Sequence, residues 1–183
     1  MTFFLCDKEK RIRKLIFSVI SPFVGLYLIY FCGLFGSIVV SEIKNVDIGI
    51  GDSWYVPLPN NCELLFIDIP ENAYIEKNGQ TVISEVSQLQ QIDNEIIGMT
   101  TTNKYFSYNT KTNALKEFLS KDELIIQNSN IKPKLINSVD FYTDIRDEIA
   151  GFWFILVGVL SVIISITVLY LLKRLIIKRR KIE

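Results

Sequence analysis

The sequence predicts an α+β membrane protein: two transmembrane helices, one near each end of the chain, flank a small antiparallel β-rich domain with one or two short helices. Three observations lead to this fold class. The 183 residues are 49% hydrophobic with a mean hydropathy of +0.28, although 22% of them are charged, so apolar and charged residues are segregated along the chain. Two long runs contain no charged residue. Between them, turn signals recur at intervals that suit short antiparallel strands.

The two uncharged runs span residues 15–41 and 150–172. A helix of about 20 apolar residues crosses a bilayer core of about 30 Å, so both runs predict transmembrane helices. The first run follows a basic start, as in a signal peptide. Its apolar stretch is longer than a signal peptide needs, however, and no small-x-small cleavage site closes it. We therefore expect an uncleaved anchor.

The charges predict how these helices are oriented. Residues 1–14 carry five basic and two acidic side chains, and residues 173–183 carry six basic and one acidic. Residues 42–149 carry nine basic and 17 acidic side chains, a net charge of −8. Basic residues beside membrane spans stay in the cytoplasm. Both ends are therefore predicted to be cytoplasmic, and residues 42–149 are predicted to form a periplasmic or extracellular domain.

The composition favours the inner (plasma) membrane of a bacterium as the location. The chain is rich in Ile, Lys and Asn, and residues 42–149 contain no N-x-S/T glycosylation sequon. The basic tail at 173–183 is expected to lie on anionic lipid, because it follows a membrane span directly. The lipid bilayer is thus the first predicted partner, and nucleic acid is not expected to be one.

The two predicted spans contain small residues but no Asp, Glu, Lys, Arg, Asn or Gln. This absence disfavours an ion or proton pathway, which needs polar groups inside the membrane. Small residues three or four positions apart let helices approach closely. Two interpretations stay open: a specific contact between the spans or with another protein, or the ordinary composition of membrane helices. The candidate helix-packing residues are Ser21, Gly25, Gly158, Ser161 and Ser165.

The outer domain is predicted to begin with a loop and a strand. Glycines and prolines punctuate residues 48–61, which predicts loops and short extended pieces. Residues 63–69 form an apolar run that predicts a strand, and Pro70 is expected to stop it because proline cannot donate to a sheet.

The clearest local signal is the Asn-Gly dipeptide at 78–79. Asn-Gly is the preferred two-residue type I′ hairpin turn, because both positions of that turn need a positive φ. Counting outward from this turn predicts that Ile75 lies opposite Val82 and that Tyr74 lies opposite Ile83.

Further strands are predicted at 86–91 and 95–99, joined by a turn at 93–94. A second hairpin is predicted within residues 104–118, with its turn at 109–113. Tyr105, Phe106 and Tyr108 belong to the first predicted strand of this hairpin, and Leu115 and Phe118 belong to the returning strand.

Two helical segments complete the outer domain. Ser120 and Glu123 have capping-box spacing, which predicts a short helix that ends before Pro133. Residues 139–150 are also compatible with a helix, and this helix is expected to continue directly into the second membrane span.

An acidic cluster lies just outside the second span. In a helix Asp140, Asp144 and Asp147 share one face, and Glu148 neighbours Asp144. Two interpretations stay open: a face that binds a cation or a protein partner, or a solvated face that supports the topology. The segment lacks EF-hand spacing and the glycine of such a loop, so no metal site is predicted.

Two further features of the outer domain are candidates for recognition. Trp54 and Tyr55 are predicted to be exposed beside the membrane, either as recognition residues or as anchors at the lipid interface. Cys62 is the only cysteine in residues 42–149, so no disulfide forms within the domain. Its thiol is expected either to be buried or to pair with a second chain.

The sequence offers no catalytic motif. It contains no His, no G-x-S-x-G, no P-loop and no dinucleotide fingerprint, so neither an enzyme nor a cofactor is predicted. Recognition of a protein partner by the acidic domain is the preferred function, as in a toxin-immunity protein or an accessory subunit of an envelope complex. The alternative is a homo-oligomeric scaffold, which would share only its two-span topology with polysaccharide chain-length regulators. A carboxylate-dependent extracytoplasmic enzyme is the third choice.

Overall fold

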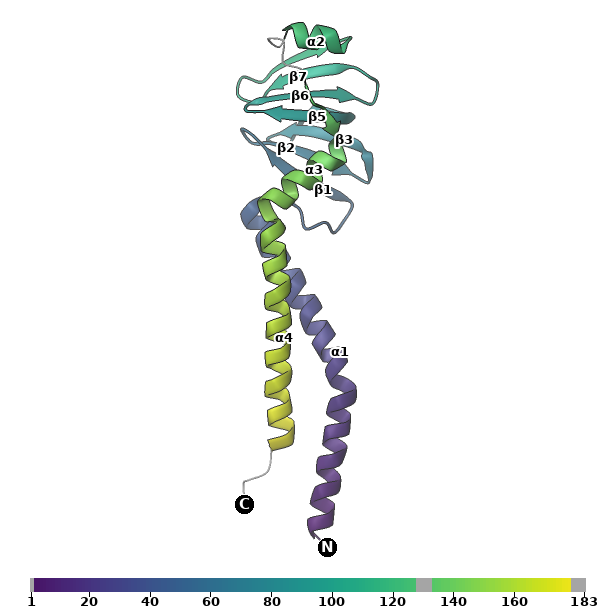
Figure 1. Cartoon of the computed structure of the whole chain (residues 1–183), viewed down its shortest axis with the longest axis vertical. Helices are drawn as coiled ribbons and strands as arrows, with labels where there is room; N and C mark the ends of the chain where they lie inside the picture. Colours follow the sequence, from purple (N-terminus) through teal and green to yellow (C-terminus); the bar gives the residue numbers. More distant parts are fainter. Residues whose placement is uncertain (1, 128–132, 179–183) are drawn as a thin grey trace. The chain divides into compact units, whose positions relative to one another are not determined.

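The computed structural model describes residues 2–127 and 133–178. The chain divides into two compact units, one comprising residues 1–40 with 152–183 and the other Ser41–Gly151. The α+β prediction is confirmed, because two long apolar helices accompany two antiparallel sheets (Figure 1). The elements are α1 (Thr2–Lys44), β1 (Ser53–Leu58), β2 (Cys62–Ile67), β3 (Ile69–Lys77), β4 (Gln80–Ile83), β5 (Val86–Ile92), β6 (Glu95–Thr100), β7 (Tyr105–Asn109), β8 (Ala114–Phe118), α2 (Lys121–Gln127), β9 (Ile136–Asn137), α3 (Ser138–Arg146), a π-helical segment η1 (Asp147–Gly151) and α4 (Phe152–Lys178).

The helical unit consists of α1 and α4. Both form because long runs of apolar residues without charge favour a backbone that satisfies its own hydrogen bonds. Within the described residues, Arg11–Lys44 and Ser138–Ile176 are long and apolar enough to cross a membrane. Many large apolar side chains on both helices point away from the protein: Leu15 is 67% exposed and Ile155 is 69% exposed.

The first sheet has the strand order β1-β2-β3-β4, with every neighbouring pair antiparallel. Residues 48–61, predicted to form loops and short extended pieces, contain one such piece, β1, which pairs with β2 along its whole length. Pro57 is tolerated there because β1 lies at the edge of the sheet, where one side of the strand needs no donor. Val56 and Leu58 are buried and supply the apolar face that holds this strand in place.

The predicted strand at 63–69 is also corrected. It divides into β2 and the start of β3, and Pro70 lies inside β3 instead of stopping the strand. The chain reverses at Asp68, whose φ is +63° and whose backbone N–H donates to the carbonyl of Asp52 at 2.7 Å. Asp is among the few residues that tolerate this left-handed backbone, so the predicted strand is interrupted at Asp68, two residues before the proline that was expected to stop it.

The hairpin turn at 78–79 is confirmed, since both residues have positive φ. The predicted register is wrong beyond the first pairs, because Ile75 lies opposite Ile83. A bulge in β4 shifts the pairing by one residue, which moves Ile83 to the buried face and leaves Val82 half-buried. The larger side chain thus enters the core beside Ile75.

The second sheet has the order β8-β7-β6-β5-β9 and is antiparallel throughout. The strands predicted at 86–91 and 95–99 are confirmed as β5 and β6, and the second hairpin is confirmed as β7 and β8. The short strand β9 was not predicted, because it pairs with β5, which lies far away in the sequence.

The core of Ser41–Gly151 lies on both faces of β6, where Ile96 and Ile97 point to opposite sides and are buried. Ile97 packs with Phe118 and Leu124 beneath α2. The capping box of α2 is confirmed: the Ser120 hydroxyl accepts from the Glu123 N–H at 3.2 Å. The Glu123 carboxylate accepts from the backbone N–H of residue 119 at 3.1 Å.

Helix α3 lies across strands of both sheets (Figure 1). Asn137 caps it by accepting the N–H of Val139 at 2.8 Å. Phe141 and Tyr142 are buried beneath it. The predicted continuation is confirmed, since the backbone stays helical from Ser138 to Ile176 through the π-helical segment η1.

Candidate functional site

The acidic cluster lies on the solvent side of α3 and η1. Asp140, Asp144, Asp147 and Glu148 are all exposed, while Phe141, on the opposite side of the helix, is buried. Within the described residues, no three His, Cys, Asp or Glu side chains converge as a metal site would require. The four carboxylates therefore form an acidic strip, which we call the α3 acidic face.

Trp54 and Tyr55 lie on β1, and neither is fully exposed. Both are half-buried, which corrects the predicted exposure. The Trp54 ring stacks on Phe66 with centroids 5.6 Å apart and an interplanar angle of 13°. The Phe66 and Tyr142 rings pack edge to face, with their centroids 5.7 Å apart. Trp54 is therefore part of an aromatic stack that joins β1, β2 and α3, and its first role is packing.

The helical unit brings together three of the predicted packing residues. The Ser165 hydroxyl donates to the carbonyl oxygen of Gly25 at 3.0 Å, and both residues are buried. Ser161 is also buried, one turn away on α4. A Cβ at Gly36 would lie 2.6 Å from Val157 Cγ1, so a side chain there would collide with α4. Small residues thus let α1 and α4 approach closely.

The other two predicted packing residues differ: Gly158 lies outside the contact between α1 and α4, whereas Ser21 faces α4. No atom lies within 4 Å of the position that a Cβ on Gly158 would take, so Gly158 is not part of the contact between α1 and α4. Its neighbour Val157 occupies the contact face instead, because successive helical residues point about 100° apart. Ser21 is half-buried and lines an apolar hollow with Leu169 and Leu172.

Asp47, which the sequence did not single out, joins several segments of the domain through hydrogen bonds. It is 6% exposed and accepts hydrogen bonds from the Tyr142 hydroxyl at 2.5 Å and from the Tyr55 N–H at 3.3 Å. Its second carboxylate oxygen accepts from the backbone N–H of Gly49. The only signal in the sequence is Asp-x-Gly, which favours a turn in which Asp bonds to the backbone two residues on. We call Asp47 and Tyr142 the Asp47–Tyr142 latch.

The surroundings of Tyr142 in the Asp47–Tyr142 latch raise the pKa of its hydroxyl. Burial raises the pKa of Tyr142 well above its usual value, and the hydrogen bond and negative charge of Asp47 add to the rise. Arg146 opposes the rise. Its guanidinium lies 3.3 Å from where a Cβ on Gly49 would be, so Gly49 leaves the space in which Arg146 lies.

Cys62 is buried, as one of its two predicted interpretations requires. Burial raises the pKa of the thiol, while Lys77 and the Tyr108 hydroxyl oppose the rise. The Lys77 ammonium donates to the carbonyl of Thr110 and to Asn113 Oδ1 at 2.6 Å. These bonds tie β3 of the first sheet to the β7–β8 turn of the second.

The sequence also did not predict that two carboxylates lie side by side in the first sheet. Glu63 of β2 lies directly opposite Glu76 of β3. Burial raises the pKa of Glu63, and the charge of Glu76 raises it further. The pair became visible only with the β2–β3 register, which no turn signal in the sequence determines.

Comparison with protein-family models, with curated proteins and with solved structures gives no match for this chain.

Proposed function

We propose that the chain is a two-pass integral membrane protein whose acidic domain binds a protein partner outside the cytoplasm. The apolar surface of α1 and α4 supports the membrane assignment. Side chains such as Phe23 and Ile166 are each 63% exposed, and transfer from water to lipid stabilises a large apolar side chain by about 2 kcal/mol. Within the described residues no other element covers this apolar surface fully. We therefore propose that lipid covers it.

The proposed topology places residues 1–14 and 173–183 in the cytoplasm of a bacterium and residues 42–149 outside it. The excess of Lys and Arg at both ends supports this orientation. The net charge of −8 on residues 42–149 is compatible with export, because acidic residues contribute little to orientation.

Cysteine labelling tests this topology. In a chain whose native cysteines are replaced by Ser, Lys111→Cys and Lys8→Cys each introduce an exposed thiol. A membrane-impermeant maleimide added to spheroplasts is expected to label the Lys111→Cys variant at once and the Lys8→Cys variant only after lysis. The reverse pattern would contradict the orientation, and equal labelling of both would contradict membrane insertion.

The α3 acidic face is the observation on which the binding function depends. Four exposed carboxylates lie on one strip of helix, directly before α4. An arrangement of like charge steers a basic partner and excludes acidic ones. A basic toxin held inactive by an immunity protein, or a basic subunit of an envelope complex, has the required chemistry.

Co-purification tests the binding function. The tagged chain is isolated from native membranes in mild detergent, beside a variant in which a short linker replaces residues 42–149. A stoichiometric partner that is lost on this deletion is expected. Neutralising the α3 acidic face should lower its recovery about tenfold, which corresponds to about 1.4 kcal/mol. The four substitutions are Asp140→Asn, Asp144→Asn, Asp147→Asn and Glu148→Gln.

The matched control neutralises four exposed carboxylates on other elements and should leave recovery unchanged. These substitutions are Asp52→Asn, Asp68→Asn, Asp93→Asn and Asp122→Asn. Equal losses in the two variants would assign the effect to net charge and not to the α3 acidic face. A preparation that contains only this chain, as a defined oligomer, would instead favour the homo-oligomeric scaffold.

A further inference from the structure

A half-open hollow of about 150 Å³ lies between α1 and α4, which we call the interhelical hollow. It extends from Arg13 to Val24 on α1 and from Leu169 to Ile176 on α4. It begins beside the contact between Gly25 and Ser165, and the two helices separate from there toward the chain ends (Figure 1). Small residues hold the helices together, and bulkier ones such as Phe17 line the hollow where they part.

The interhelical hollow has the length of one lipid monolayer. The 11 positions from Arg13 to Val24 correspond to about 16 Å along α1, at 1.5 Å per residue. This is about half of a bilayer core of about 30 Å. In the proposed topology, Arg13 therefore lies at the cytoplasmic headgroups and Val24 lies near the middle of the bilayer.

The volume of the interhelical hollow favours a lipid tail over a third helix. A helix with its side chains is about 10 Å across, so a length of about 16 Å needs more than about 1,000 Å³. The hollow offers about 150 Å³. Every side chain that lines it is apolar, apart from those of Arg13 and Ser21. Because an empty gap would cost these side chains their dispersion contacts, an acyl chain is the occupant that suits both shape and polarity.

Arg13 gives the interhelical hollow a site for a phosphate. It is half-buried, and among the described side chains it is the only charged one that lines the hollow. A guanidinium binds phosphate oxygens through two parallel N–H donors. Arg13 also makes an interaction within the protein, and because a guanidinium carries five N–H donors it can bind a phosphate at the same time.

The charges around this end of the hollow are predominantly basic. Three exposed basic side chains lie within two positions of residues that line it: Lys14, Lys173 and Arg174. Asp7 and Glu9 precede Arg13 on α1, but residues 1–14 still carry a net charge of +3. Basic pockets between membrane helices on the cytoplasmic side bind anionic lipid headgroups.

We propose that the interhelical hollow binds one anionic phospholipid of the cytoplasmic leaflet, with an acyl chain between α1 and α4 and its phosphate on Arg13. This inference rests on the membrane insertion and orientation of the proposed function. It does not depend on the α3 acidic face or on a protein partner.

Native mass spectrometry of the full chain in detergent tests the lipid class. The chain is titrated with phosphatidylglycerol or with phosphatidylcholine that carries the same acyl chains, and bound lipid is counted from the mass. The first lipid is expected to bind at least about fivefold more tightly, because choline adds a positive charge beside the basic residues. Inorganic phosphate at the same concentration should not compete, because it has no acyl chain to place in the hollow.

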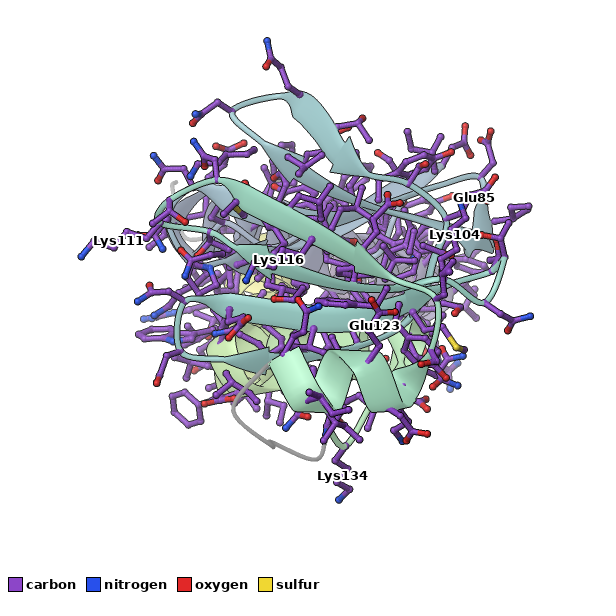
Figure 2. All side chains as sticks on the ribbon, turned by 90° about the horizontal axis from the view of Figure 1, so that it is seen from above. Glu85, Lys104, Lys111, Lys116, Glu123 and Lys134 are labelled. Carbon is purple, nitrogen blue, oxygen red and sulfur yellow. The ribbon has the colours of Figure 1, made fainter. Side chains whose placement is uncertain are left out.

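Arg13→Gln tests the phosphate site. It should weaken binding of phosphatidylglycerol about fivefold and leave phosphatidylcholine less affected, so the preference between the two lipids shrinks. Arg11→Gln is the matched control. Arg11 is exposed on the same helix and does not line the hollow, since residues two positions apart point about 200° apart. Lys111→Gln removes a charge that extends from the outer domain into solvent (Figure 2). Both controls should leave the affinity unchanged.

Ser21→Phe tests the acyl-chain site by filling the interhelical hollow. It should weaken binding of both lipids at least about fivefold, because it removes the space that their tails share and leaves Arg13 in place. Ser18→Phe introduces the same ring at an exposed position of α1 that does not line the hollow, and it should leave both affinities unchanged.

Three results would overturn the inference. One is equal affinity of the unmodified chain for the two lipids. Another is equal weakening by Arg13→Gln and Arg11→Gln, which would indicate a general attraction of basic residues to anionic lipid. The third is unchanged binding by Ser21→Phe. If cysteine labelling supports the topology while the two lipids bind equally, only this inference fails. If labelling contradicts membrane insertion, the proposed function fails and this inference falls with it.

Discussion

Gly98→Ala is expected to destabilise strongly the domain formed by residues 41–151. A Cβ on Gly98 would lie 2.4 Å from Phe106 Cζ and 2.6 Å from the backbone oxygen of Gln88, and real Cβ atoms do not approach neighbours this closely. Phe106 is buried, and the oxygen belongs to the paired strand β5, so neither can move without disturbing a sheet. Overpacking of this kind destabilises a core by about 3 kcal/mol.

Urea titration of the full chain in detergent measures this loss. Trp54 reports on the domain through its stacking on Phe66, and Trp153→Phe removes the second tryptophan. Gly151→Ala serves as the matched control, since its nearest neighbour would be Asp147 Cβ at an ordinary 3.6 Å. The control should change the free energy of unfolding by less than about 1 kcal/mol. A similarly small change for Gly98→Ala would contradict the packing described for β6.

Asp47→Ala is expected to lower the free energy of unfolding by about 3 kcal/mol, because hydrogen bonds to a buried carboxylate are among the stronger ones. The substitution leaves the Tyr142 hydroxyl and the Tyr55 N–H without their acceptor. Tyr142→Phe should cost about 1.5 kcal/mol. In the double variant the losses should be less than additive, since both single variants break the same bond. Full additivity would show that the two residues act independently.

The latch also predicts a loss of stability at alkaline pH. The pKa of Tyr142 is raised in the folded state by burial and by Asp47, with Arg146 opposing and Asp147 adding to the rise. A raised folded-state pKa stabilises fully below the unfolded value of about 10, and the stabilisation is lost as the pH rises toward the folded value. Urea titrations at increasing pH above 10 should therefore show a falling free energy of unfolding. Tyr142→Phe should make this fall shallower, and an unchanged slope would exclude Tyr142 as its source.

Local features of the chain were predictable because their causes lie close together in the sequence. Uncharged apolar runs long enough to cross a bilayer favour helices, so the two long helices α1 and α4 follow from composition. The Asn-Gly turn at 78–79 and the capping box at Ser120 each depend on a few adjacent residues. Gly25 and Ser165, two of the small residues that the spacing singled out, meet across the two helices.

Features that depend on distant partners were not predictable. The register of β3 and β4 departs from the turn's own count because a bulge brings Ile83 into the core, and that core is built by other strands. The half-burial of Trp54 depends on Phe66 and Tyr142. The position of Pro70 inside β3 was not predictable either, because the chain turns earlier, at Asp68.

By itself, the sequence determined that this protein has two long apolar helices, an acidic β-rich segment between them and an acidic strip beside the second helix. The tertiary structure alone decided that Asp47 meets Tyr142, 95 positions away, and that Glu63 lies opposite Glu76. Composition and turn chemistry act over a few residues. Burial and strand pairing join residues that only the folded chain brings together.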